Sequence, residues 1–310
     1  MTANIPVAPV SRSCDHHETM KTGDVVMSAP VDAPDWRRLT QDQLDLGFNN
    51  TIHVPETSTI VAEWDRLSAE MRARHPQSLD LRYGPRERNR IDFLKANNGG
   101  PTLVFIHGGY WQTRAKETFA FCARGPMAHG INVALIGYTL APDATLDQIV
   151  DEVRTGIDTL VNELPALGSS ADNMVVSGWS AGGHLSSMTL GHPHIKAGLL
   201  ISGIYDLEPI RHSYLNAKLG LDEAMSRRNS PVLQPGGVDK PLVVVAGSGE
   251  LPLLRKQSAD FAAHRAVHGL PVVYEEIPGA NHFTMMDELA SPSGRLITLV
   301  RQLFGQISSS

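Results

Sequence analysis

The sequence predicts an α/β domain in which a mostly parallel central sheet is covered by helices on both faces. Apolar runs of strand length, such as TLVFIHGG (102–109) and NMVVSGWS (173–180), alternate with segments of helical length. Continuous apolar strands are typical of parallel sheets whose two faces are both buried. The 310 residues, of which 42% are hydrophobic, are enough to bury one large core. We therefore expect a single domain.

The N-terminal segment differs from the rest of the chain. Residues 1–35 are rich in Pro, Ser, Thr and Asp without apolar periodicity, which predicts a flexible arm before the domain (36–310). This segment has no basic start followed by an apolar block, and no run in the chain approaches the roughly 20 apolar residues that cross a bilayer. With only Cys14 and Cys122, a disulfide framework is not expected. We predict a cytoplasmic protein with no membrane partner.

Strand and helix patterns follow one another along the body of the domain. Two segments that alternate polar and apolar residues, 78–84 and 89–96, predict an antiparallel pair at the start of the sheet. Residues 206–238 break the later alternation, and we expect them to form a small cap or a pocket wall. The remaining predicted strands are 102–109, 131–138, 173–180, 195–203, 241–249 and 271–279, and the predicted helices are 114–129, 146–164, one from 181, 252–268 and 292–304.

Charge and histidine spacing exclude several classes of partner. The formal net charge of −6 provides no basic surface for nucleic acid or for an anionic membrane. The arginines within 72–74 and 86–90 are interpreted as solvated faces. His192 and His194 form an H-x-H pair, but no carboxylate or cysteine accompanies them at metal-ligand spacing. We expect no metal and no other cofactor.

The segment MVVSGWSAGGHL (174–185) places a serine between an apolar strand and a helix. Gly178, Ser180 and Gly182 form a G-x-S-x-G sequence in the strand–turn–helix context that this motif requires. The sharp turn exposes the serine hydroxyl, and glycine on both sides relieves crowding. The helix that starts at Ala181 directs free N–H groups at the serine oxygen. Ser180 is therefore the candidate nucleophile, and an ordinary strand-to-helix turn is the alternative.

A glycine-containing loop follows the strand TLVFI, in the sequence HGGYW (107–111). Acyl transfer requires hydrogen-bond donors fixed where negative charge develops on the carbonyl oxygen. We predict that backbone N–H groups from this loop and from the start of the later helix form such an oxyanion hole. The candidates are Gly108, Gly109, Tyr110 and Ala181. His107 is interpreted as a structural histidine that orients the loop.

A serine nucleophile needs an imidazole base and an acid that orients the base. His282 follows the last predicted strand, where the chain order Ser, acid, His places the base. His184 lies too close to Ser180 along one helix to act on it, and we expect it to be packed. Glu250 is the first carboxylate after the strand PLVVVAG, so it is the candidate acid. Asp206, at another strand end, is the alternative that stays open.

Aromatic residues occur beside the predicted catalytic groups. Trp111 ends the glycine loop, Trp179 precedes Ser180, and Tyr205 follows a strand end. We predict that these three side chains line a substrate pocket suited to an aryl group, with ordinary core packing as the alternative. A formyl group needs little acyl space, so a tight acyl side would favour formamides or short acyl chains.

Taken together, these motifs resemble those of the α/β-hydrolase superfamily, in the branch that includes the hormone-sensitive-lipase-like esterases. Within that branch, HGGYW, GWSAGGHL, ISGIYDLEPI (201–210) and NHF (281–283) are most similar to the serine-hydrolase kynurenine formamidases, or arylformamidases. GELPLLRKQSADF is similar to the acid-bearing loop of that family, with Glu250 where aspartate is more usual. The resemblance covers roughly residues 45–305. It implies the fold, a Ser-His-acid mechanism and no metal.

The expected function is that of a serine hydrolase that cleaves a small acyl amide or ester through an acyl-enzyme. Arylformamidase activity is the main expectation, with Ser180, Glu250 and His282 as catalytic residues. A short-acyl carboxylesterase is the first alternative, and a non-catalytic ligand receptor on the same fold is a remote one. The expected partner is a small-molecule amide or ester with an aromatic group, and self-association into a homodimer is left open.

Overall fold

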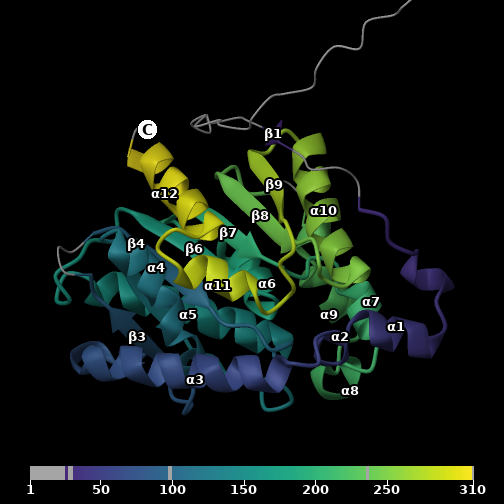
Figure 1. Cartoon of the computed structure of the whole chain (residues 1–310), viewed down its shortest axis with the longest axis horizontal. Helices are drawn as coiled ribbons and strands as arrows, with labels where there is room; N and C mark the ends of the chain where they lie inside the picture. The colour runs from purple at the N-terminus through teal and green to yellow at the C-terminus, as the bar shows by residue number, and fades with distance from the viewer. Residues whose placement is uncertain (1–24, 27–30, 97–99, 235–236, 309–310) are drawn as a thin grey trace, which may run out of the picture.

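The computed structural model describes residues 25–26, 31–96, 100–234 and 237–308, and these residues contain a nine-stranded sheet (Figure 1). The strand order is β1-β9-β8-β7-β6-β4-β5-β3-β2. β3 pairs antiparallel with β2 and β5, whereas the other neighbours are parallel, so the predicted fold class and opening pair are confirmed. The strands are β1 (Val25–Val26), β2 (Leu81–Arg82), β3 (Arg90–Leu94), β4 (Thr102–Ile106), β5 (Asn132–Ile136), β6 (Met174–Trp179), β7 (Ile195–Ile201), β8 (Leu242–Gly247) and β9 (Val272–Ile277).

Helices cover both faces of this sheet, as predicted. The side chains of β4 alternate between two cores, with Leu103 and Phe105 in one core and Val104 and Ile106 in the other. Figure 1 shows α11 and α12 crossing in front of the strands. The helices on that face are α3 (Thr57–Arg74), the 3-10 helix η3 (Lys116–Ala123), α4 (Arg124–Ala128), α11 (Met285–Ala290) and α12 (Arg295–Ser308), and those on the other are α5 (Leu146–Glu163), α6 (Ala181–Thr189) and α10 (Pro252–Val267).

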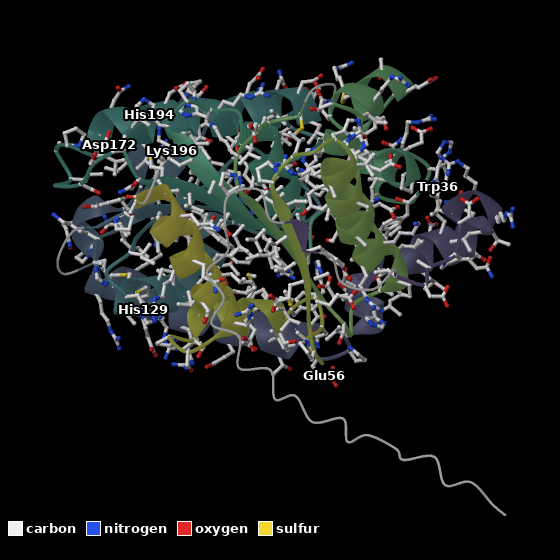
Figure 2. All side chains as sticks on the ribbon, turned by 90° about the horizontal axis from the view of Figure 1, so that it is seen from above. Trp36, Glu56, His129, Asp172, His194 and Lys196 are labelled. Atoms are coloured by element: carbon white, nitrogen blue, oxygen red, sulfur yellow. The ribbon has the colours of Figure 1, made fainter. Side chains whose placement is uncertain are left out.

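Because the central strands are parallel, their carboxyl ends meet at one edge of the sheet. Figure 2 shows His194 and Lys196, near the start of β7, at one end of the molecule and Trp36 at the other. Trp36 stacks on His212, which follows β7 in the chain, with ring centroids 5.4 Å apart. The loops that leave β4, β6, β7, β8 and β9 therefore gather at the edge that carries the predicted site residues.

The sequence prediction was wrong in detail for residues 114–129. One helix was expected there, but the chain forms η3 and then the short helix α4. Pro126 has no N–H to donate, so a continuous α-helix through this segment would lose a hydrogen bond. Six of the eight residues of η3 are buried, and this 3-10 helix packs against α3 and α11.

The structure also contains N-terminal elements that the sequence analysis did not assign. β1 lies within the predicted arm, yet it pairs in parallel with Val272 and Val273 of β9. The rest of that arm up to residue 30 lies outside the described residues. A capping box at Thr40 and Gln43 marks the start of α1. The other new elements are η1 (Trp36–Arg38), α1 (Gln41–Gly47), α2 (Asn50–His53), the long helix α3 and η2 (Pro76–Ser78).

Residues 206–234 and 237–238 contain short helices that lie beside the carboxyl edge. Arg228 forms an ion pair with Asp147 of α5 at 2.5 Å, and the Tyr214 N–H donates to Asp45 of α1 at 2.8 Å. These contacts fix the segment to elements on both sides of it. The helices are α7 (Glu208–Arg211), α8 (Asn216–Leu219), α9 (Glu223–Arg228) and η4 (Pro231–Leu233). Across the described chain, no helix combines the length and the apolar character that a bilayer span needs.

A buried charge cluster ties η3 to the antiparallel end of the sheet. Lys116, 3% exposed, donates to Asp80 at 2.6 Å and to Asp92 and Glu117 at 2.7 Å each. Asp92 is fully buried and also pairs with Arg72 at 3.1 Å. A buried ion pair of this kind adds little net stability, but removing one partner leaves a charge without compensation.

We predict that Lys116→Met lowers the free energy of unfolding by about 3 kcal/mol, because Asp92 then keeps its charge in a buried site. Urea denaturation measures the loss, and adding Asp92→Asn is expected to recover part of it. Lys256→Met removes an exposed lysine that pairs with Asp260 at 2.9 Å and serves as the matched control. Its expected effect is below about 1 kcal/mol. A similar loss in both single variants would contradict the assignment.

Candidate active site

Ser180 occupies the turn between β6 and α6, as predicted. Its backbone has φ 59° and ψ −120°, a strained conformation of the kind found at functional positions. The flanking glycines are required by close packing. A Cβ on Gly178 would lie 2.2 Å from the Gly182 oxygen, and one on Gly182 would lie 1.9 Å from the Ile106 oxygen. The Ser180 N–H donates to Ile201 O at 2.8 Å, which anchors the turn on β7.

His282 and Glu250 lie together at the same edge of the sheet. His282 follows β9, Glu250 follows β8, and the His282 Nδ1–Glu250 Oε2 distance is 2.7 Å. Both residues are buried, with exposures of 2% and 3%. Trp179 fixes the position of His282. Its Nε1 donates to His282 O at 2.8 Å, and the centroids of the two rings lie 4.7 Å apart. The predicted base and acid are therefore brought together.

The second oxygen of Glu250 is held by two further donors. Ser202 Oγ donates to Glu250 Oε1 at 2.5 Å, and the Gly247 N–H donates to the same atom at 2.6 Å. Ser202 directly follows β7 and has a positive φ of 51°, so its hydroxyl reaches the neighbouring loop. Ser202 was not among the predicted site residues, although its place at the end of a parallel strand is a signal that sequence can supply.

Asp206, the alternative acid, lies at the start of α7 and does not contact His282. Its Oδ1 accepts the Glu208 N–H at 2.9 Å, at the start of α7. It lines a separate cavity of about 500 Å³ with Trp36 and Lys256, and neither Ser180 nor His282 borders that cavity. Among the two candidates, Glu250 is thus the carboxylate that contacts His282.

The predicted oxyanion loop passes directly against the serine turn. A Cβ on Gly108 would lie 2.9 Å from the Ser180 Cβ, so the glycine permits this approach. Gly109 has φ 111° and Tyr110 has φ 49°, and these values turn the loop sharply. Within the described chain, four backbone N–H groups around the serine have no protein acceptor, namely those of Gly108, Gly109, Tyr110 and Ala181. These are the groups that the sequence predicts as oxyanion donors.

His107 and His184 are buried histidines that support the loop and the turn. His107 Nδ1 donates to Gly108 O at 2.8 Å, and its ring stacks on Tyr138 at 4.2 Å. His184 Nδ1 accepts from Trp111 Nε1 at 3.3 Å, and its Nε2 donates to Asn229 O at 2.7 Å. Burial lowers the pKa of His107 to about 3 and that of His184 to about 4, so both are neutral near pH 7.

A cavity of about 220 Å³ adjoins the serine and the histidine. Trp179 lines it, as predicted, and so does Tyr110, whose hydroxyl donates to Phe48 O at 2.7 Å and accepts from Asn50 at 3.3 Å. Residues 214–215, which lie in the segment expected to form a cap or a pocket wall, form one part of the cavity wall. α2 forms another part, which was not predicted. The lining residues are Asn50, Thr51, Gly109, Tyr110, Gln112, Thr113, Arg114, Trp179, Ser180, Tyr214, Leu215, His282 and Phe283.

Two of the predicted pocket residues do not line this cavity. Trp111 is fully buried, because its positive φ of 58° turns the indole inward onto His184. Tyr205 stacks on Phe261 of α10 at 4.3 Å and borders the separate 500 Å³ cavity. The prediction for Trp111 and Tyr205 was therefore wrong, and core packing is the role that the structure assigns to Trp111.

Among the described residues, the one carboxylate cluster with metal-ligand spacing already has a protein partner. In the described chain, the group with metal-ligand spacing is Asp80, Asp92 and Glu117, and Lys116 binds all three. His192 Nε2 contacts Asp158 at 2.9 Å, which the sequence analysis did not anticipate.

Comparisons with known proteins agree with this geometry. A BD-FAE family model matches residues 93–195. The kynurenine formamidase of Danio rerio is 29% identical over 294 residues, which cover 88% of this chain and 99% of the fish protein. That of Salmo salar is 32% identical over 246 residues, or 74% and 82% of the two chains. Two solved structures are similar: a candidate thioesterase from Silicibacter sp. (TM-score 0.77, 24% identity, 84% of this chain and 99% of that one) and an esterase from Pyrobaculum calidifontis (TM-score 0.64, 20% identity, 81% and 93%).

A parallel strand that leads into a strained serine turn, with histidine and carboxylate on later loops, is the arrangement of an α/β-hydrolase. The similar solved structures share this fold. Because the curated relatives are kynurenine formamidases, the chain is a hydrolase of that class. Within the class, the chain belongs to the kynurenine formamidase family, because it matches 82% of the salmon enzyme at 32% identity.

We predict that the stability of the protein falls on acidification through His107. Its pKa is about 3 when folded and near 6.5 when unfolded, so between these values the unfolded chain binds one more proton. The free energy of unfolding should therefore decrease as the pH falls below about 6.5. His107→Asn keeps a donor for Gly108 O but does not titrate. Between about pH 6 and pH 5 the wild type should lose about 1 kcal/mol more than this variant in urea denaturation; parallel pH profiles would contradict it.

Proposed function

We propose that this protein is an arylformamidase that transfers a formyl group from an aromatic amine to Ser180 and then to water. The small cavity beside Ser180 and His282 carries the proposal. At about 220 Å³ it lies below the roughly 300–1,000 Å³ of pockets for drug-sized ligands, so a long acyl chain has little room. Trp179, Tyr214 and Phe283 give it aromatic walls that suit an aryl amine. Kinship with the kynurenine formamidases supports a formamide of kynurenine as substrate.

In the proposed mechanism His282 is the general base. Its Nδ1 donates to Glu250, which leaves Nε2 free to accept the Ser180 proton. Ser180 Oγ attacks the formyl carbon, and His282 then gives the proton to the departing amine as the C–N bond breaks. Water, deprotonated by His282, attacks the formyl-enzyme. The bond between the formyl carbon and Ser180 Oγ then breaks, His282 returns the proton to Oγ, and formate leaves.

The oxyanion of each tetrahedral intermediate would be held by the free backbone N–H groups. Gly109 and Tyr110 line the same cavity as Ser180, Ala181 follows the serine in the chain, and the N–H groups of these three residues and of Gly108 have no protein acceptor in the described part of the chain. Donors that are fixed before the reaction stabilise the developing charge without reorganisation. Ser202 acts through Glu250 as a positioning residue, because it holds the carboxylate and not the substrate.

We also propose that the protein acts in the cytoplasm. Cys122 is a buried free thiol, which is compatible with a reducing compartment.

We predict graded losses of kcat on removal of the proposed triad. Ser180→Ala and His282→Ala should lower kcat by about 10⁴–10⁶-fold, and Glu250→Gln by about 10²–10⁴-fold, because the histidine loses its orienting charge. Asp206→Asn is the matched carboxylate control and should change kcat less than about threefold. Single-turnover kinetics and labelling of Ser180 by a fluorophosphonate provide the measurements. A larger loss for Asp206→Asn than for Glu250→Gln would assign the acid role to Asp206.

We predict a steep preference for the formyl group in a matched amide series. Among the N-formyl, N-acetyl and N-butyryl derivatives of kynurenine, kcat/KM should fall by about tenfold or more at each step, because the cavity resists added methylenes. p-Nitrophenyl acetate and butyrate provide the ester comparison. Faster cleavage of the butyrate ester than of every formamide would replace the proposal with a carboxylesterase. Ser180→Ala controls for uncatalysed hydrolysis.

A further inference from the structure

The cavity at the candidate site contains one residue with a permanent charge. Of its lining residues, all described by the structure, Arg114 is the only Lys, Arg, Asp or Glu. The others contribute hydroxyl, amide, aromatic or aliphatic groups, apart from the His282 imidazole. Glu250 lies behind His282 and is not among the lining residues. Arg114 is therefore the residue of this wall that can offer a positive charge to a ligand, and no carboxylate of the wall opposes it.

The guanidinium of Arg114 has no protein partner within the described chain. It makes no hydrogen bond and no ion pair there, although the charge of Asp65 on α3 attracts it. Arg255, by comparison, pairs with Glu276 at 2.8 Å. Arg114 is half-buried, and burial lowers its pKa although the group stays charged. A partly desolvated cation without a partner is costly, and a bound anion would remove this cost.

The backbone holds Arg114 against the proposed oxyanion loop. A Cβ on Gly109 would lie 2.9 Å from Arg114 Cγ, so the aliphatic stem packs on that loop. Arg114 has a positive φ of 72°, and its carbonyl accepts a hydrogen bond from Arg88. Arg88 also donates to Tyr138 O at 2.8 Å. Arg88, which is itself held by Tyr138 O, thus fixes the backbone of a strained residue, and strain of this kind persists where the surroundings determine it.

We propose that Arg114 is a specificity residue that binds a carboxylate on the amine portion of the substrate. The inference rests on the proposed function, because a formyl group has no substituent that could carry the carboxylate. The substrate class is then an aryl formamide with an acidic side arm, such as an amino-acid group. A guanidinium presents two parallel N–H donors to a carboxylate, which fixes orientation as well as charge.

The test compares two substrates that differ only in charge. N-formylkynurenine carries the carboxylate, and its carboxamide has the same shape without that negative charge. Arg114→Met keeps the length and the packing on Gly109, whereas Arg114→Lys keeps the charge. Arg301→Met, an exposed arginine on α12, is the control for a change in net charge.

Arg114→Met should lower kcat/KM for N-formylkynurenine by about 10- to 100-fold, mainly through KM, because a charge-assisted hydrogen bond is lost. For the carboxamide the same variant should change kcat/KM less than about threefold. Arg114→Lys should recover part of the loss, and Arg301→Met should cause none. Equal losses on both substrates would overturn the proposal and leave Arg114 as a support for the oxyanion loop. No loss on either substrate would also overturn it.

A second substrate pair separates this inference from the proposed function. 3- and 4-Acetoxybenzoate carry the carboxylate on the leaving group, and phenyl acetate is their neutral counterpart. If the wild type cleaves no formamide, the proposed function fails. The inference is still supported if Arg114→Met abolishes a preference of the wild type for either acetoxybenzoate. It is overturned if the ratio of kcat/KM values stays unchanged.

Discussion

The buried carboxylate of Glu250 is the interaction on which the candidate site depends. It accepts hydrogen bonds from Ser202 after β7, from Gly247 at the end of β8 and from His282 after β9. The side chain is 0% exposed, and a charge in such a place must exchange its water for fixed donors. Parallel strands supply those donors because their carboxyl ends meet at one edge. One charge therefore joins three neighbouring loops and orients the histidine.

The backbone turn at Ser180 imposes the second constraint, and it explains why the sequence was informative. Gly178 and Gly182 are required by contacts below 3 Å, and Gly108 is required by the approach of the next loop. Close contacts of this kind require glycine at fixed positions, so they can be recognised in the sequence. For the same reason, Ser180, the glycine loop, Glu250 and His282 were predicted from motifs and strand ends, and the alternation of apolar strands predicted the parallel sheet.

Other features depend on contacts between distant segments, which no local pattern records. Trp111 and Tyr205 also follow strand ends, but a positive φ in one case and a stacking partner on α10 in the other turn both rings away from the cavity. Ser202 was missed because its hydrogen bond to Glu250, at 2.5 Å, joins two loops that lie 48 residues apart in the sequence. The cavity wall from α2 was missed because the N-terminal helices pack on a site assembled more than 50 residues later.

Among the described residues, buried cations outside the candidate site are paired with protein groups, whereas the cation at the site is not. Lys116 meets three carboxylates, and Arg265 donates to three backbone carbonyls, whereas Arg114 lines the cavity and has no side-chain partner in the described chain. A substrate carboxylate in a small cavity would repel the negative charge that develops on the carbonyl oxygen in the transition state. A guanidinium beside the oxyanion loop offsets that repulsion in a low-dielectric site, where charges interact strongly. Recognition of an anionic side arm and stabilisation of the oxyanion are then compatible, because the cation neutralises the bound carboxylate while the backbone N–H groups hold the oxyanion.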